Sequence, residues 1–300
     1  MYPLGKQFEV DYTKTKCNSK NVIQGKFFRI SVITERVVRL EYSPSGQFID
    51  RPTQLILRRN VGSVDFSMRQ DNNILEITTK YFSLAYVKEK PFIGTKIDPM
   101  KNLRITLASH EKDRNKDWFI GQAEARNLNG NMISVDVENA PTYLKGLYSL
   151  DGFASINDSY NKVIMEDGTL ADPPADHIDI YVFMYDRDFK HVLSDYFKIT
   201  GSPSLIPRYA LGNWWSRNVT YDDKSVQSLI RNFERKRIPI SIVLFDNDWH
   251  YRNIGNYKSL KSGFSFNNEL FVDPKKMIDQ FHVRGIRVGL CINPTEGIFP

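Results

Sequence analysis

Ile240-Ser-Ile-Val-Leu-Phe-Asp-Asn-Asp-Trp-His250 is the middle one of three segments that decide the fold of this chain. Each segment is an apolar run that ends in aromatic, amide or acidic residues. The other two are Pro207-Arg-Tyr-Ala-Leu-Gly-Asn-Trp-Trp-Ser-Arg217 and Ile286-Arg-Val-Gly-Leu-Cys-Ile-Asn-Pro294. Short apolar runs bounded by such residues are consistent with buried strands of a parallel sheet.

Two helices are predicted between the three strands. Between Thr220 and Pro239, apolar residues recur at helical spacing. Asp273-Pro274 is a strong helix start, because Asp can accept the free amides of the first turn and Pro loses nothing by lacking one. Gly285 stands where a left-handed residue commonly ends a helix. The alternation of strands and helices predicts parallel pairing and the opening of a β/α barrel.

The residues that follow these strands are the candidate substrate ligands. In a β/α barrel the chemistry gathers at the carboxyl ends of the strands, where loops converge over a rigid floor. Aromatic rings beside carboxylates suit a sugar, since a pyranose has an apolar face that stacks on a ring and hydroxyls that bond to carboxylates. The candidates are Trp215, Arg217, Asp246, Asp248, Trp249 and His250.

Several of these candidates also have a purely structural interpretation. Trp214 and Trp215 are consecutive, so a strand points them to opposite faces and only one of them can line a pocket. His250 follows a strand, where a histidine is as often a packing residue as a ligand. Asp248 can equally orient Arg217 or cap a loop.

The functional interpretation is strongest for Asp246. An acid that follows four apolar residues at a strand end is costly to bury without a purpose or a partner. Asp246 and Asp248 are two residues apart and would share one face of a strand. Retaining glycoside hydrolysis needs two carboxyl groups about 5 Å apart, so the pair is a geometric candidate for a dyad. Asn293 and Glu296 follow the third strand, and Glu296 is most simply a loop acid.

Four motifs carry a family resemblance. They are Gly-x-Trp-Trp-Ser-Arg, the strand that ends in Asp-x-Asp-Trp, Gly263-Phe-Ser-Phe-Asn-Asn-Glu-Leu-Phe-Val-Asp-Pro274, and Gly-Leu-Cys-Ile-Asn-Pro. In this order they closely resemble glycoside hydrolase family 31, which contains α-glucosidases and α-xylosidases. Upstream, Gly146-Leu-Tyr-Ser-Leu-Asp-Gly-Phe-Ala-Ser-Ile-Asn-Asp-Ser159 is similar to the end of the family's N-terminal β-domain. The resemblance covers residues 115 to 300 by motif and the first hundred only by pattern.

The resemblance implies an α-glucosidase-like glycosidase that hydrolyses O-glycosyl bonds of α-glycosides with retention. In that family the carboxylate nucleophile and the acid that protonates the leaving oxygen lie on later barrel strands, beyond Pro300. The resemblance makes Asp246 an acceptor of a sugar hydroxyl, in the subsite where the bond is cut, rather than a member of a dyad with Asp248. No catalytic residue is therefore assigned within the chain.

Length limits what the chain can do. A β/α barrel needs about 250 residues, and the part from Ile206 to Pro300 is enough for only about three of its eight strands. We expect a truncated barrel, inactive as given, whose third strand exposes an edge that invites self-association. The alternative function, from another class, is a noncatalytic carbohydrate-binding or scaffold protein with a remnant barrel.

The first two thirds of the chain are mainly β. A β-sandwich domain is predicted over residues 1–204, interrupted by one helix from Asp188 to Ile199, and the barrel domain over 205–300. Gly201-Ser-Pro-Ser204 marks the boundary by its turn residues. The predicted strands are rich in β-branched and aromatic residues; they are 28–33, 37–42, 74–79, 82–87, 103–107 and 178–184.

One stretch departs from the family pattern. Family members often use an acid from an N-domain loop to reach the sugar subsite. The equivalent stretch here, Gly121-Gln-Ala-Glu-Ala-Arg-Asn-Leu-Asn-Gly130, offers Asn129 where an acid is expected, with Glu124 as a displaced substitute. Sugar and linkage preference therefore stay open.

Composition argues against several other classes. The net charge is +6, but 41 basic residues are interspersed with 35 acidic ones, so no nucleic-acid partner is predicted. No apolar run is long enough for a membrane helix, and the start lacks the apolar core of a secretory signal, so a cytoplasmic location is expected. Cys17 and Cys291 lie in different predicted domains and read as free thiols. No metal or nucleotide motif appears, and no cofactor is predicted.

Overall fold

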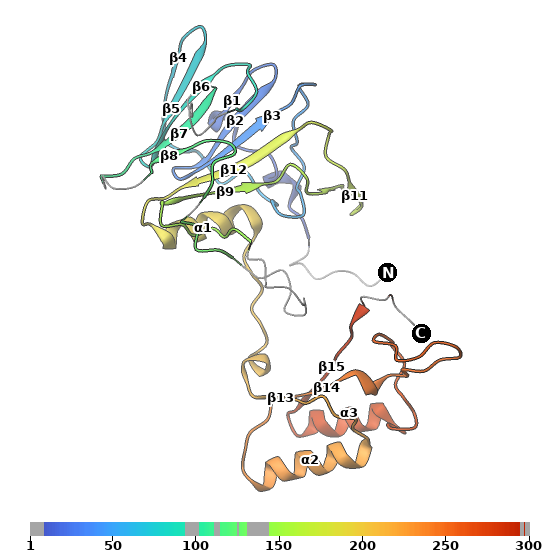
Figure 1. Cartoon of the computed structure of the whole chain (residues 1–300). Helices are drawn as coiled ribbons and strands as arrows, with labels where there is room; N and C mark the ends of the chain where they lie inside the picture. Colours follow the sequence, from blue (N-terminus) through green and yellow to red (C-terminus); the bar gives the residue numbers. More distant parts are fainter. Residues whose placement is uncertain are drawn as a thin grey trace. The chain divides into compact units, whose positions relative to one another are not determined.

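The computed structural model describes residues 9–93, 102–110, 115–124, 126–130, 144–294 and 297. Glu296 lies outside these residues. The chain divides into two compact units, Met1–Pro203 and Ser204–Pro300. Figure 1 shows a first unit of sheets with one helix and a second unit of strands alternating with helices.

The first unit contains two five-stranded antiparallel sheets. One has the strand order β1-β2-β3-β12-β9, and the other follows chain order from β4 to β8. A separate hairpin is formed by β10 (Val163–Ile164) and β11 (Leu170–Ala171). The strands of the first sheet are β1 (Val22–Gln24), β2 (Phe28–Thr34), β3 (Val37–Tyr42), β12 (Ile178–Met184) and β9 (Phe153–Asn157). Those of the second are β4 (Ser67–Gln70), β5 (Ile74–Thr78), β6 (Phe82–Val87), β7 (Leu103–Leu107) and β8 (Asp117–Trp118).

One hydrophobic cluster joins the two sheets. It takes alternate residues of β2 and β3, such as Ile30 and Leu40, and alternate residues of β5 and β6, such as Ile77 and Leu84. The alternation is clearest in β5, where every second residue is buried and the others are exposed. The second sheet therefore buries one face and exposes the other, as is usual for antiparallel sheets.

The first sheet is covered on both faces. Its second face packs against helix α1 (Phe189–Thr200) through Val192 and Ile199, which lie in one cluster with Tyr181 and Phe183 of β12 (Figure 1). As a result β2 is buried along its whole length. Polar residues such as Arg39 on this face are buried too, and they require partners within the fold.

The second unit is a parallel β-α-β-α-β arrangement, as the sequence predicted. The strand order is β13-β14-β15, and both pairings are parallel. Helices α2 and α3 lie on the same side of this sheet (Figure 1). The elements are the 3-10 helix Arg208–Leu211, β13 (Trp214–Ser216), α2 (Asp223–Arg235), β14 (Ile242–Phe245), the 3-10 turn Asn247–Trp249, α3 (Pro274–Val283) and β15 (Arg287–Leu290).

Both helices of this unit begin with an aspartate cap, and that of α3 was predicted. The Asp273 carboxylate accepts the Lys276 amide at 2.9 Å, and Pro274 occupies the first turn. Asp222 and Ser225 form a reciprocal capping box at the start of α2. Gly285, just after α3, has a φ of 75°, the left-handed conformation that favours glycine. No helix among the described residues is long and apolar enough to cross a membrane.

Candidate functional site

Parallel pairing brings the carboxyl ends of the three strands to one edge of the sheet. β13 ends at Ser216, β14 at Phe245 and β15 at Leu290, and the register aligns these ends. The first residue of α2 is bonded to the loop that follows β14, because the Asp223 amide donates to the Leu270 carbonyl at 3.1 Å. The candidate site is therefore built on this edge.

The two faces of the sheet have different neighbours. Trp215, Val243 and Phe245 belong to the hydrophobic cluster that includes α2 and α3. The Trp215 ring packs edge-on against Phe233 of α2, and its Nε1 donates to the Tyr221 hydroxyl at 3.0 Å. Trp215 therefore serves the packing of helix against sheet. Of the two consecutive tryptophans, it is the core residue.

The opposite face carries Trp214, Leu244 and Gly289. A Cβ on Gly289 would lie 2.7 Å from Leu244 Cδ1, so the absence of a side chain in β15 makes room for Leu244. Trp214 is 49% exposed on this face, and its Nε1 donates to the Ala210 carbonyl at 3.0 Å. In a β/α barrel the face away from the helices is the interior.

Asp246 directly follows the carboxyl end of β14. It is half-buried and interacts with neighbouring groups. The pKa of the Cys291 thiol is raised, first by burial and then by the nearby Asp246 carboxylate. Because Cys291 directly follows β15, this effect places the Asp246 charge beside the end of the neighbouring strand. A carboxylate at this position can accept hydrogen bonds from a polyol.

Asp248 no longer belongs to the strand. β14 ends at Phe245, and residues 247–249 form a 3-10 turn, so a spacing of two does not place Asp246 and Asp248 on one strand face. The geometric basis of an Asp246–Asp248 dyad is therefore absent. Asp248 accepts a hydrogen bond from the Thr220 hydroxyl and another from Arg252 Nη1 at 3.0 Å.

These two partners explain the electrostatics of Asp248. Its pKa is lowered, mainly by the hydrogen bond from Thr220 and also by the Arg252 guanidinium. Both partners stabilise the charged form of the carboxylate. One of the two structural interpretations from the sequence was that Asp248 orients Arg217, but Asp248 pairs instead with Arg252, four residues onward. Asp248 thus links the loop after β13 to the loop after β14.

Trp249 and His250 are buried rather than presented to solvent. Trp249 is 3% exposed, and its Nε1 donates to the Cys291 carbonyl at 2.7 Å. Its ring packs edge-on against His250 and Phe266. His250 Nδ1 lies 2.9 Å from the Tyr251 carbonyl oxygen, which requires that this nitrogen carry the proton. The hydrogen bond from Trp249 to Cys291 therefore joins the segment after β14 to the segment after β15.

Arg217 lies apart from Asp246 and Asp248. It is exposed and lines a separate hollow of the second unit together with Trp215, Tyr221, Arg231 and Arg235. This hollow borders α2, on the helix side of the sheet. Two predicted ligands, Trp215 and Arg217, are thus not brought together with the acids.

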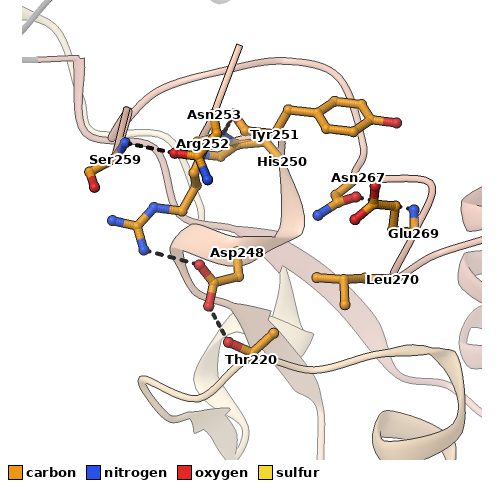
Figure 2. Close-up of a pocket in the computed structure, with 10 residues that line it drawn as sticks. All are labelled: Thr220, Asp248, His250, Tyr251, Arg252, Asn253, Ser259, Asn267, Glu269 and Leu270. Carbon is orange, nitrogen blue, oxygen red and sulfur yellow. Dashed lines mark hydrogen bonds and ion pairs between the residues drawn. The ribbon is translucent and has the colours of Figure 1, made fainter. Parts of the chain in front are cut away.

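A pocket of about 520 Å³ opens beside Asp248, and we refer to it as the Asp248 pocket. Figure 2 shows Asp248 between Thr220 and Arg252, with Asn267, Glu269 and Leu270 on the opposite wall. Most of this lining was not predicted as ligands from the sequence, although Asn267, Glu269 and Leu270 lie within the Gly263–Pro274 motif. The lining residues are Thr220, Asp248, His250, Tyr251, Arg252, Asn253, Ser259, Asn267, Glu269 and Leu270.

The N-domain loop expected to reach a sugar is folded against its own unit. Glu124 is 8% exposed, and its carboxylate accepts hydrogen bonds from Ser155 Oγ at 2.7 Å and Asn127 Nδ2 at 3.2 Å. Glu124 therefore stabilises this loop and is not presented as a ligand. Asn129 adopts a left-handed φ of 63°, a conformation that asparagine tolerates.

Among the described residues, one group has the composition of a metal site. The potential ligand atoms of Glu41, His177 and Asp179 lie within 4.8 Å of one another, and all three residues are buried. However, Arg29 binds Glu41 through two hydrogen bonds of 2.6 and 2.9 Å, and Arg39 binds Asp179 in the same way at 2.9 and 2.6 Å. The carboxylates are already neutralised, so the group is an internal ion network.

Comparison with known proteins matches this architecture. Residues 203–298 match the model of the glycosyl hydrolases family 31 TIM-barrel domain. An α-xylosidase of Saccharolobus solfataricus is 31% identical over 120 residues, which cover 40% of this chain and 16% of that protein. An α-glucosidase of the same organism is 29% identical over 173 residues, or 52% of this chain and 24% of that protein. The matched segments are thus a minor part of both relatives.

Solved structures show the same fold over most of the chain. The family 31 dextranase of Flavobacterium johnsoniae, complexed with glucose, superposes with a TM-score of 0.56 at 15% identity. The superposition covers 92% of this chain and 36% of that enzyme. The superposition covers most of the chain, so the likeness in fold extends to the β-rich first unit. The domain match and the named relatives support a member of glycoside hydrolase family 31, and the solved structures have the same fold.

Proposed function

We propose that the intact protein hydrolyses α-glycosides and that this chain supplies Asp246 as an acceptor of a sugar hydroxyl. The observation that carries the proposal is the position of Asp246 directly after the carboxyl end of β14, beside Cys291 at the end of β15. Loops at this end of a β/α barrel hold the reacting groups in nearly all enzymes of this fold. Relatives named as an α-xylosidase and an α-glucosidase support the substrate class.

Asp246 would act by binding rather than by reacting. A carboxylate that accepts hydroxyl hydrogen bonds gains about 1.5–3 kcal/mol for each one, more than a neutral acceptor does. It holds the sugar ring so that the anomeric carbon faces the nucleophile. An orienting interaction of this kind contributes to the rate, because the reacting atoms must be held close together and aligned.

The reaction itself needs two further carboxyl groups. In a retaining glycosidase one carboxylate attacks the anomeric carbon while a carboxylic acid protonates the departing oxygen, and water then cleaves the glycosyl ester. The resemblance to family 31 assigns both groups to barrel strands beyond residue 300. We propose, accordingly, that residues 1–300 alone do not turn over α-glycosides. Incubation of this piece with an aryl α-glucoside tests the point, and turnover above a buffer blank would contradict it.

Retention is tested on the intact protein. Proton NMR can record the anomeric configuration of the first sugar released from an aryl α-glycoside, before mutarotation. The proposal predicts the α-anomer. An initial β-anomer would mean inversion and would rule out the covalent glycosyl intermediate.

Self-association of the 300-residue piece is also proposed. Among the described residues, β15 pairs on one side only, with β14, and an unpaired strand edge offers backbone donors and acceptors to another chain. Light scattering should then give a mass above that of the monomer. A monomer that resists protease as well over residues 206–300 as over the first unit would contradict this proposal.

A further inference from the structure

The sequence predicts Trp249 as a sugar ligand, but its side chain is too deeply buried to present a ring face to a sugar. We propose instead that Trp249 is a positioning residue, which holds Asp246 where its carboxylate can meet a sugar hydroxyl. This inference rests on the proposed function, because it concerns how the carboxylate assigned there is kept in place.

Asp246 stands where the regular pairing of its strand has ended. The register of β14 with β15 ends at Phe245, and residues 247–249 form a 3-10 turn. Beside this end, the Cys291 amide donates to the Phe245 carbonyl at 2.9 Å. Contacts other than strand pairing must therefore hold the backbone of Asp246.

Trp249 supplies two such contacts. Its backbone amide donates to the Asp246 carbonyl at 3.3 Å, and its indole Nε1 donates to the Cys291 carbonyl at 2.7 Å. These two bonds link Asp246 to the end of the neighbouring strand through a single residue. The Cys291 amide completes the connection, because it is bonded to Phe245. Loss of the indole N–H would leave the turn that contains Asp246 without its bond to Cys291.

The Trp249 ring is itself held firmly. The ring lies edge-on against Phe266, with centroids 5.0 Å apart, and belongs to one hydrophobic cluster with Phe245 and Phe271. The Trp249 carbonyl accepts the Asn267 amide at 2.8 Å. A support of this kind matters to catalysis, because a ligand group that shifts by about 1 Å can cost a large part of the rate.

The Asp246 carboxylate is held beside the same cysteine. The pKa of the Cys291 thiol is raised first by burial and then by the Asp246 charge. Cys291 thus accepts the indole bond through its carbonyl and responds to the carboxylate through its thiol. Titration of this thiol therefore reports the position of the carboxylate, and it needs no substrate.

The first test follows alkylation of Cys291 by iodoacetamide in the intact protein, by mass spectrometry of its peptide at several pH values. The thiolate is the species that reacts, so the midpoint of the rate profile reports the thiol pKa. Trp249→Phe keeps an apolar ring but removes the indole donor. The midpoint should fall in this variant, as it should in Asp246→Asn. A midpoint unchanged in either folded variant would overturn the proposal.

Two further variants complete this test. Trp118→Phe makes the same exchange at an equally buried tryptophan of the first unit and should leave the midpoint as in the parent. Should circular dichroism show that Trp249→Phe does not fold, Phe266→Leu loosens the Trp249 ring without removing its N–H. This milder change should lower the midpoint by less, and an unchanged midpoint would again count against the positioning role.

Kinetics on an aryl α-glucoside decide whether Trp249 acts through Asp246. Trp249→Phe should lower kcat/KM by about fivefold or more, because the carboxylate is no longer held in place. In the Asp246→Asn background the same change should cost less than about twofold, because the group that it positions is already gone. Equal losses in the two backgrounds would overturn the proposal. If the intact protein cleaves no α-glycoside, the proposed function falls, and the alkylation profile alone decides on the positioning role.

Discussion

Carboxylates in the two units of this protein differ in burial and in pairing with arginine. In the first unit Glu41 and Asp179 are fully buried, and each is bound by an arginine through two hydrogen bonds. In the second unit Asp248 keeps a third of its side chain exposed and Asp246 is half-buried at a strand end. Buried and fully paired acids stabilise a fold but cannot reach a ligand. Acids at the strand ends are partly exposed, so a ligand can approach them.

The pKa values reflect the same contrast. Burial by itself raises the pKa of Glu41, but the Arg39 guanidinium and the hydrogen-bonded Arg29 guanidinium together help to lower that pKa to about 2. Asp158, in the same unit, lies 4.0 Å from Arg59 Nη2, and burial raises its pKa to about 6, helped by the charge of Asp179. The pKa of Asp248 is lowered chiefly by one hydroxyl. Burial and charged neighbours therefore shift the pKa values of acids more strongly in the interior of the first unit than hydrogen bonds do at the surface of the second.

The largest effect on stability should come from Arg39→Ala. This change leaves Glu41 and Asp179 buried with fewer partners, and breaking a buried ion pair costs about 3–5 kcal/mol. Chemical denaturation of the intact protein should show this loss in the free energy of unfolding. Arg69→Ala, on exposed strand β4, is the control and should change stability by no more than about 0.5 kcal/mol. A loss below about 1 kcal/mol for Arg39→Ala would contradict this difference between the two units, because it is far less than the cost of breaking a buried ion pair.

A smaller and pH-dependent effect is expected at Asp158. Its pKa in the folded state, about 6, lies above the ordinary value for aspartate, so the folded protein holds this proton more tightly than the unfolded chain does. Its contribution to stability is therefore full below about pH 4 and is lost as the pH rises through about 6. Asp158→Asn removes this loss. Relative to the parent, the variant should gain on the order of 2 kcal/mol between pH 4 and pH 7.

Urea denaturation at several pH values measures this gain. A difference between variant and parent that is the same at pH 4 and pH 7 would show that Asp158 ionises in the folded protein as freely as in the unfolded chain. The Thr53 hydroxyl donates to both Asp158 oxygens, at 3.0 and 2.9 Å. In that case this hydrogen bonding would stabilise the charged carboxylate by at least as much as burial destabilises it.

A smaller effect on stability than at Arg39 or Asp158 is expected for Asp248→Asn. The Asp248–Arg252 pair is about one third exposed, and such pairs contribute about 0–1 kcal/mol. The variant should therefore unfold within about 1 kcal/mol of the parent at moderate salt. A loss comparable to that of Arg39→Ala would show that Asp248 is as structural as the buried acids, which would remove the distinction between the two regions.

Regular elements of the fold were largely predictable. The strands around Phe28, Val37 and Ile178 and both helices of the second unit appear where apolar patterning and caps placed them. Strand β4 was missed because its sequence, Ser-Met-Arg-Gln, has no apolar alternation and is paired only through its neighbour β5. Strand β9 was quoted only within a family motif, because it is short and mixed in polarity.

The candidate site was harder to predict, because it depends on which face each strand turns to the helices. The sequence shows that Trp214 and Trp215 point in opposite directions, but the packing of Phe233 decides that Trp215 is the core residue. Likewise, the 3-10 turn after β14 separates Asp246 from Asp248 and pairs the latter with Arg252. Strand periodicity cannot foresee where a strand ends.

The central claim is that Asp246 binds a sugar hydroxyl and contributes little to the stability of the fold. The kcat/KM of Asp246→Asn tests this claim most directly. The variant keeps the shape of the side chain but loses its charge, so the intact protein should lose at least about tenfold in kcat/KM on an aryl α-glucoside, as expected for a charged hydrogen bond. Its free energy of unfolding should stay within about 0.5 kcal/mol of the parent. An unchanged kcat/KM, or a variant that no longer folds, would contradict the claim.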